Sequence, residues 1–191
     1  WAREWNRWWP DARPLAVLED GTAVPPQAGG AVVSFDYARV HRLQLNAAGP
    51  WDVLIIDECH AVKSPETGRS QALLGRAGIV HHARRCWCAS GTPMPNHPEE
   101  LWPLLRVAGV TDLEFANWIK RFCTGYLLPG RGSRWVVTGA RRSELPALRR
   151  LLDESGMMLR RMKSDVLPEL PPIVSEEMVV DPAPFPLEDL V

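Results

Sequence analysis

The sequence has no apolar run that approaches about 18 residues, the length at which a run predicts a membrane-spanning helix. It also has no signal peptide, no internal repeat and no low-complexity segment. Cysteine is scarce and never forms a CxxC pair; the four cysteines are Cys59, Cys86, Cys88 and Cys123. These absences exclude a disulfide-rich scaffold and favour reduced thiols inside a cell.

Zinc ligands are present as residue types, so a metal site has to be weighed. The candidates are His60, His81, His82, Cys86, Cys88 and Cys123. Structural zinc sites normally use CxxC-type knuckles, whereas Cys86 and Cys88 flank Trp87 in an apolar run that suits alternate positions of a strand. We therefore expect no cysteine-bound metal.

The chain of 191 residues is 46% apolar, enough for one sizeable core with an appendage. Its net charge of -1 conceals an asymmetry, because residues 120–165 hold 11 Lys and Arg against 4 Asp and Glu, and residues 166–191 hold none against 6. A local basic excess of this kind indicates a polyanionic partner, although a solvated helix face is the commoner explanation for any single arginine pair. Trp1 and Val191 both look like cuts through a longer chain, which we call the parent protein.

The most informative stretch is residues 53–60, where four branched apolar residues precede two acids, a thiol and an imidazole. An apolar run without alternation is typical of a strand buried on both faces of a parallel sheet. Ligands of such sheets bind beyond the carboxyl ends of the strands, so Asp57 and Glu58 are predicted to lie at the mouth of a crevice. One acid can hold Mg²⁺, directly or through water, and the other can take a proton from an attacking water, which points to nucleotide hydrolysis. The alternative is an exposed turn with solvated acids.

Strands are also predicted at residues 15–18, 31–35 and 86–89, the last ending in the turn Ser90-Gly91-Thr92-Pro93. Helices are predicted from Asp36 to about residue 45, from Ser64 to about residue 75 or 78, and over 99–108 and 111–122. Strands that alternate with helices indicate an α/β fold with a parallel sheet. A helix is also predicted near the start of the chain, where Trp1, Trp5, Trp8 and Trp9 share one face; core packing is the favoured role of that face and a nucleic-acid stacking platform the alternative.

Glycine, proline and arginine dominate residues 124–142, which predicts a flexible or hairpin-like insertion. A helix follows over 143–152, and a strand is expected at residues 157–159. From Pro168 the chain reads as a linker with one more strand candidate at residues 173–180.

Three blocks occur in a fixed order: residues 32–36, then Asp57-Glu58-Cys59-His60, then residues 90–93. This order resembles the first motor lobe of superfamily 2 helicases. Residues 159–172 read LRRMKSDVLPELPP and match the LRRxKxDVxxxLPP block of the Snf2 family of DNA-dependent ATPases. The short insert between Cys123 and Ser143 is most similar to the annealing-helicase, or HepA-related, branch.

The resemblance implies a RecA-like parallel sheet with flanking helices, as a partial first motor lobe. Residues 1–123 would hold the motifs that follow Ia through III, residues 124–167 would close the lobe with the basic insertion, a helix and the LRRxKxDV block, and residues 168–191 would lead toward a second lobe. The GxxxxGK[ST] phosphate loop of motif I does not occur in these residues. The isolated chain is therefore expected neither to bind ATP tightly nor to hydrolyse it.

The resemblance also implies roles for single residues. Asp57 would organise Mg²⁺ on ATP, Glu58 would be the general base, and His60 would link the nucleotide site to motif III and the second lobe. Ser90 and Thr92 would couple the ATP state to DNA, with Gly91 allowing the tight turn. The expected DNA contacts are Ser34, Arg160, Arg161 and Lys163.

The implied partners are the DNA backbone, read with little sequence preference, and a second RecA-like lobe of the parent protein. No membrane partner is expected, and the protein would act inside the cell, in the cytoplasm or nucleoid of a prokaryote or phage host or in a eukaryotic nucleus. Two other functions stay open: a DNA-binding or scaffolding module that has lost ATPase activity, and an RNA helicase of superfamily 2.

Overall fold

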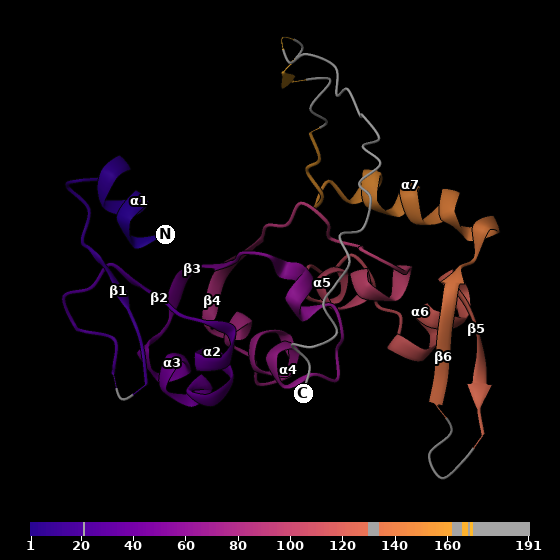
Figure 1. Ribbon diagram of the computed structural model, residues 1–191, viewed down its shortest axis with the longest axis horizontal. Coiled ribbons are helices and arrows are strands. Elements are labelled where there is room, and N and C mark those ends of the chain that lie inside the picture. Colours follow the sequence, from indigo (N-terminus) through magenta and orange to yellow (C-terminus); the bar gives the residue numbers. More distant parts are fainter. Residues whose placement is uncertain (21, 130–133, 162–165, 168, 170–191) are drawn as a thin grey trace, which may run out of the picture. The chain divides into compact units, whose positions relative to one another are not determined.

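A computed structural model describes residues 1–20, 22–129, 134–161, 166, 167 and 169 of the chain. The chain divides into two compact units, Trp1–Met158 and Leu159–Val191, and all helices and strands named below belong to the first (Figure 1). Residues 124–158 thus share a unit with residues 1–123. The strand predicted at residues 173–180 lies outside the described residues, and the functional division at 123 and 167 remains a prediction.

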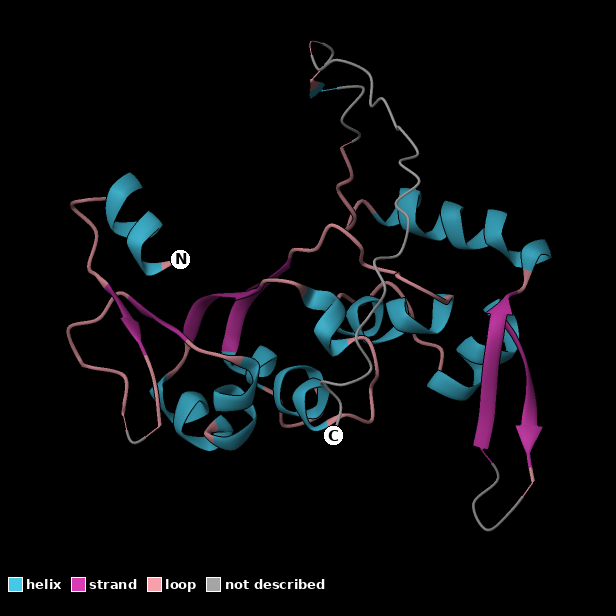
Figure 2. Ribbon diagram, viewed as in Figure 1, coloured by secondary structure: helices cyan, strands magenta, loops and turns pink. Residues whose placement is uncertain are grey.

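Two parallel strand pairs form the first half of this unit (Figure 2). Strand β1 (Leu15–Val17) pairs with β2 (Gly30–Val32), and β3 (Trp51–Ile56) pairs with β4 (Ala83–Cys88). The helical elements around them are α2 (Phe35–Val40), α3 (Arg42–Ala48), η1 (Cys59–Val62), α4 (Gly68–Leu74) and η2 (Ile79–His82). Parallel strands with flanking helices confirm the predicted α/β class, although the described strands form separate two-stranded sheets.

One core joins these helices to the strands. Its buried residues are Leu18, Tyr37, Ala38, Leu45, Ile56, Cys59, Val62, Leu73, Leu74 and Ile79. The prediction that residues 53–56 are buried on both faces is wrong, because Ile55 is 45% exposed and its register partner Trp87 is 57% exposed. Helices pack against Leu54 and Ile56, and the opposite face of the pair stays open within the described part of the chain.

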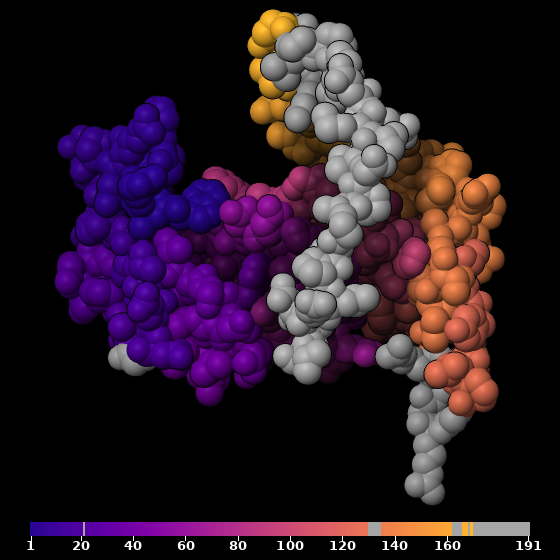
Figure 3. All heavy atoms as spheres, in the orientation of Figure 1, coloured from indigo at the N-terminus to yellow at the C-terminus, as the bar shows by residue number. Residues whose placement is uncertain are grey.

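The N-terminal helix α1 (Ala2–Trp8) forms where the tryptophan spacing predicts it, but it contributes no buried residue. Trp1, Trp8 and Trp9 are 63%, 66% and 59% exposed, so the core-packing prediction is wrong. The space-filling view shows the atoms of α1 at the surface (Figure 3). Trp5 is the best covered of the four; it contacts the Trp9 ring and donates a hydrogen bond to the Arg13 carbonyl. Periodicity thus located the helix but not its partner.

A second core occupies the rest of the unit. It is built from η3 (Pro98–Leu101), α5 (Trp102–Val107), α6 (Phe115–Phe122), β5 (Cys123–Leu128), β6 (Arg134–Ala140), η4 (Arg142–Glu144) and α7 (Leu145–Ser155). Trp118 is fully buried at its centre and donates its indole hydrogen to the Pro98 carbonyl. Antiparallel pairing of β5 with β6 confirms the hairpin-like alternative for this segment, and its being an insertion remains a prediction. A Cβ at Gly125 would clash with the Val136 carbonyl, so this strand position requires glycine.

Several predicted boundaries need correction. Thr67 rather than Ser64 caps α4, because its hydroxyl accepts from the Ser70 amide. The helix predicted from Asp36 begins one residue earlier, at Phe35, and breaks at His41 into α2 and α3. Residues 157–159 are not a strand; α7 ends at Gly156 in the left-handed conformation, and irregular chain follows. No helix among the described residues is long and apolar enough to cross a membrane.

Candidate active site

The acid turn, Asp57 and Glu58, directly follows β3, and both residues are exposed. The Asp57 carboxylate accepts hydrogen bonds through both oxygens, from the Glu58 amide at 2.9 Å and from the Trp1 indole at 2.9 Å. Glu58 is the one non-glycine residue with positive φ in the described chain, at φ 49° and ψ 50°. This left-handed backbone ends the strand abruptly and starts η1. The Trp1 contact spans 56 positions, and no sequence signal predicted it.

His60 lies between the acid turn and the end of β4. Its Nδ1 atom is 3.1 Å from Glu58 Oε2 and 3.2 Å from Ser90 Oγ. Because a carboxylate can only accept hydrogen bonds, its proximity favours the imidazole form that carries hydrogen on Nδ1. One imidazole therefore connects the carboxylate of Glu58 to the hydroxyl of Ser90.

Backbone hydrogen bonds hold the two strand ends together behind this junction. The Ala89 amide donates to the Ile56 carbonyl at 2.9 Å, and the Cys59 amide donates to the Ala89 carbonyl at 2.9 Å. The Thr92 amide then donates to Ser90 Oγ at 3.1 Å. The structure thus brings Asp57, Glu58, His60, Ser90 and Thr92 to one edge of the strand pair.

Gly91 sits in this turn without a conformation that requires glycine. Its φ lies outside the left-handed region, and an added Cβ would have no neighbour within 4 Å. Neither backbone conformation nor space requires glycine here, and the role of Gly91 in coupling remains a prediction.

Thiols pack beneath the acid turn. Cys59 is buried, and the Cys86 and Cys88 sulfurs lie 3.9 Å apart. The hydrogen bond with Cys88, together with burial, raises the pKa of the Cys59 thiol, so it stays neutral. The hydrogen bond from Cys88 lowers the pKa of Cys86. Among the described residues, no group of three or more His, Cys, Asp or Glu side chains is arranged to hold a metal ion.

Mg²⁺ does not need a cluster of three protein ligands, and the acid turn suits it. It prefers hard oxygen ligands and usually binds through one or two carboxylates together with water and substrate phosphates. The exposed Asp57 and Glu58 carboxylates are ligands of this chemistry at one strand end. Both carboxylates already have partners, Asp57 the Glu58 amide and the Trp1 indole, and Glu58 the His60 ring, but carboxylate oxygens keep further lone pairs for a cation.

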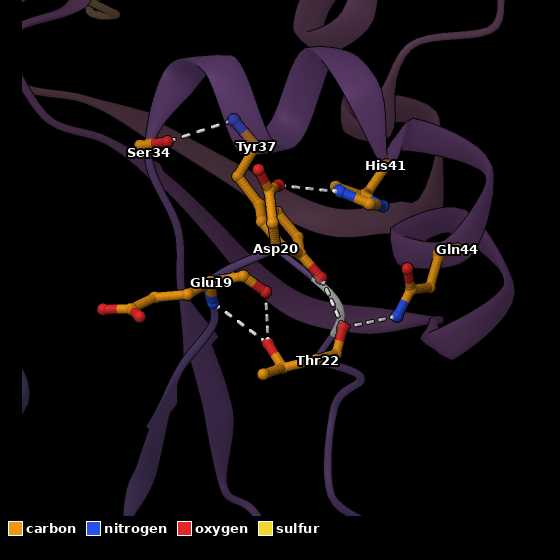
Figure 4. Close-up of polar contacts among 7 residues, drawn as sticks. All are labelled: Glu19, Asp20, Thr22, Ser34, Tyr37, His41 and Gln44. Carbon is orange, nitrogen blue, oxygen red and sulfur yellow. Dashed lines mark hydrogen bonds and ion pairs between the residues drawn. The ribbon is translucent and has the colours of Figure 1, made fainter.

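The expected DNA contacts belong to different parts of the chain. Ser34 caps α2, where its hydroxyl accepts from the Tyr37 amide at 3.0 Å (Figure 4). Arg160 and Arg161 are exposed residues of the second unit, Leu159–Val191. Lys163 lies outside the described residues.

A polar cluster near Ser34 has no counterpart among the sequence-based predictions. The Thr22 carbonyl accepts from Tyr37 Oη at 2.8 Å and from Gln44 Nε2 at 3.0 Å, and His41 Nε2 lies 3.2 Å from Asp20 Oδ1 (Figure 4). These contacts fasten the loop after β1 to α2 and α3. The four-residue spacing of Tyr37 and His41, whose rings stack at 4.3 Å, is the one local signal that could have indicated it.

Known proteins resemble the chain along almost its whole length. The sequence model of the SNF2-related domain family matches residues 1–185. The chain is 31% identical over 201 residues to the DNA annealing helicase and endonuclease ZRANB3 of Mus musculus, covering 100% of the chain and 18% of that protein. It is 33% identical over 187 residues to the SWI/SNF-related matrix-associated actin-dependent regulator of chromatin subfamily A-like protein 1 of Xenopus tropicalis, covering 95% of the chain and 18% of that protein. A more distant match is the chromatin-remodeling ATPase INO80 of Sclerotinia sclerotiorum, 30% identical over 135 residues, which cover 69% of the chain and 7% of that protein. The chain therefore spans less than a fifth of the length of these curated relatives.

Proposed function

Because the chain belongs to the SNF2-related domain family, we propose that it is part of the first motor lobe of an ATP-dependent DNA translocase. The Snf2 resemblance read from residues 159–172 is thereby confirmed. In the parent protein, ATP hydrolysis would drive movement on double-stranded or fork DNA. The names of the relatives, a DNA annealing helicase and a chromatin-remodeling ATPase, support both the nucleotide and the DNA in this proposal.

The junction of Glu58, His60 and Ser90 carries the proposal. A carboxylate at the end of β3 meets a hydroxyl at the end of β4 through one imidazole, with both separations close to 3 Å. Glu58 would take the proton from the attacking water, and His60 would relay the change at Glu58 to Ser90 and Thr92. Asp57 would hold the Mg²⁺ of bound ATP, directly or through water. When bound, Mg²⁺ supplies charge stabilisation at the phosphates.

The proposal assigns the phosphate-binding half of the site to other residues of the parent protein. Backbone amides and a lysine of a phosphate loop normally cradle the β- and γ-phosphates, and no such motif occurs in these residues. The 191-residue chain alone is therefore proposed to be inactive. A second RecA-like lobe would close on the junction from the side of Ser90 and Thr92.

DNA would be bound mainly through its phosphates. Ser34 exposes a hydroxyl whose hydrogen is free to be donated, since the cap uses only its oxygen. Arg160, Arg161 and Lys163 would add positive charge where the chain leaves the lobe. Contacts of this kind carry no sequence information, and their strength falls steeply with salt. The protein would act where intracellular DNA is, in a nucleus, a nucleoid or the cytoplasm of a phage host.

Glu58→Gln in the parent protein tests the hydrolytic role. The amide cannot accept a proton, so we expect DNA-stimulated ATP hydrolysis to fall by about 10²- to 10⁴-fold while nucleotide affinity is retained. Turnover is measured by phosphate release with and without duplex DNA, and affinity with a fluorescent ATP analogue. Glu66→Gln is the matched control, since Glu66 is an exposed glutamate eight positions away. Unchanged turnover would remove Glu58 from the base role, and stimulation by RNA but not DNA would favour the RNA-helicase alternative.

A further inference from the structure

The segment 90–97 links the end of β4 to η3 without regular secondary structure. From Ser90 to Asn96 the backbone makes no hydrogen bond to another backbone group among the described residues. Its course therefore depends on side chains at its two ends. At the near end, Ser90 contacts His60 and accepts from the Thr92 amide.

Glu100 holds the far end. Its carboxylate accepts from the Asn96 amide at 2.8 Å, from Asn96 Nδ2 at 2.8 Å and more weakly from the His97 amide at 3.4 Å. Lys63 completes the set, with Nζ 2.7 Å from Glu100 Oε1. The Glu100 side chain is 7% exposed and that of Lys63 33%, so water covers little of this contact.

Four donors keep this buried carboxylate charged. Burial alone would raise the pKa of Glu100, but the hydrogen bonds from Lys63 and Asn96 outweigh it and lower the pKa below its usual value. Charge-assisted hydrogen bonds are short and strong, and loss of one partner leaves a buried charge uncompensated. The Lys63–Glu100 pair is thus a firm contact between two segments that are 37 positions apart.

Lys63 is also the residue that directly follows η1, the one-turn helix that begins after Glu58 and contains His60. The pair therefore fastens the far end of segment 90–97 to the element that carries the acid turn. Together with the His60–Ser90 contact it closes a ring, in which both ends of the segment are tied to η1.

We propose that Lys63 and Glu100 are positioning residues that hold segment 90–97 against η1 and so keep Ser90 within hydrogen-bond distance of His60. The proposal rests on the proposed function, because the junction of Glu58, His60 and Ser90 matters only if this edge hydrolyses ATP. Neither residue contacts the acid turn itself. Their loss is expected to affect the reacting arrangement rather than nucleotide affinity.

The first test uses steady-state ATP hydrolysis by the parent protein with saturating DNA. Lys63→Met and Glu100→Gln are expected to lower kcat by about 10- to 100-fold, the scale of a displacement of about 1 Å, and to leave KM for ATP within about twofold. Lys63→Arg keeps the cation and should restore most of kcat. Arg149→Met is the control, because it removes an exposed ion pair with Asp153 and should change neither constant. Wild-type kcat in folded Lys63→Met and Glu100→Gln would overturn the proposal.

Hydrogen–deuterium exchange of the same variants separates this inference from the proposed function. In Lys63→Met, exchange should speed up at Asn96 and also at Thr92, whose amide donates to Ser90 at the opposite end of the segment. An effect confined to Asn96 and His97 would show a local structural role and overturn the positioning claim. If the wild-type parent protein does not hydrolyse ATP, the proposed function fails, and the exchange at Thr92 still decides whether the pair positions the segment.

Discussion

Glu58 combines a strained backbone with the proposed catalytic carboxylate. At φ 49° its Cβ crowds the following carbonyl, which costs an L-residue about 1–2 kcal/mol. Two hydrogen bonds hold this conformation. The Glu58 amide donates to Asp57 Oδ1, and the Ala61 amide donates to the Glu58 carbonyl. Strain of this kind persists where surrounding contacts fix it, and it is commonest at functional sites.

Replacing Glu58 by alanine or by glycine should separate the backbone cost from the side-chain contacts. Both variants lose the contact with His60, but glycine adopts positive φ freely. We expect Glu58→Gly to be more stable than Glu58→Ala by about 1 kcal/mol in urea unfolding of the 191-residue chain. The reverse order is expected at Arg149, an exposed position inside α7, where glycine should be the less stable by about 1 kcal/mol. Equal stability of the two Glu58 variants would show that the turn is not strained.

At the scale of the element, Ser34 caps α2, and the same side chain is a proposed DNA contact. Its hydroxyl oxygen accepts the Tyr37 amide and so satisfies one of the free donors at the start of the helix. This cap fixes where β2 ends and where α2 begins. Tyr37 also donates its hydroxyl hydrogen to the Thr22 carbonyl, so the cap helps to position the loop that follows β1.

Two substitutions distinguish capping from DNA contact. Ser34→Ala removes the cap and should lower the free energy of unfolding by about 1 kcal/mol. Ser34→Asp keeps a capping oxygen, so stability should change little, but it should weaken DNA binding about fivefold, because like charges about 4 Å apart in water repel by about 1 kcal/mol. Binding is measured by fluorescence anisotropy with labelled duplex DNA. Ser64→Asp adds the same charge at another exposed serine and should leave DNA affinity unchanged. Unaltered DNA affinity in Ser34→Asp would contradict the contact.

Element positions could be predicted wherever local patterning determines them. Residues 53–56 and 86–88 are strands because branched, aromatic and thiol side chains favour the pleated backbone. Pro93 has no backbone N–H to donate to a sheet, so the strand is not expected to continue past it. Helix starts were harder to predict, since serine is the better cap by residue type and yet the contact with the Ser70 amide shows that Thr67 caps α4. The exposure of Trp87 and Ile55 could not be predicted, because it depends on what packs against that face.

The candidate site shows the same limit. Asp57 and Glu58 could be placed at the mouth of a crevice from the rule that ligands bind beyond the carboxyl ends of parallel strands, and the family resemblance linked His60 to Ser90. The left-handed turn at Glu58 and the Lys63–Glu100 pair could not, because the first depends on backbone strain and the second joins positions 37 apart in the chain. Tertiary packing selects such contacts from many alternatives with the same residue types.

At the scale of the whole molecule, the formal charge overstates the number of basic side chains that are available to contact DNA. The segment 120–165 holds 11 basic residues, yet Arg141 donates to the carbonyls of Lys120, Arg121 and Cys123 and thereby braces the hairpin. Arg121 pairs in turn with Glu144. The salt dependence of DNA binding should therefore reflect fewer phosphate contacts than the count of basic residues implies.

For the nucleotide, too, charged residues alone do not make a binding site. Asp57 and Glu58 are exposed carboxylates, which attract Mg²⁺ but repel the phosphates of ATP unless amides and a lysine cradle them. We therefore expect the purified 191-residue chain to bind Mg²⁺–ATP no more tightly than about millimolar, the range in which binding supplies only about 4 kcal/mol. Isothermal titration calorimetry measures this, after circular dichroism has established a cooperative thermal transition. The parent protein is the positive control, and its Asp57→Asn variant should lose most of the Mg²⁺ dependence. Micromolar affinity or DNA-stimulated turnover by the 191-residue chain would mean that its own residues hold the phosphates, and the assignment of that role to a loop elsewhere in the parent protein would fall.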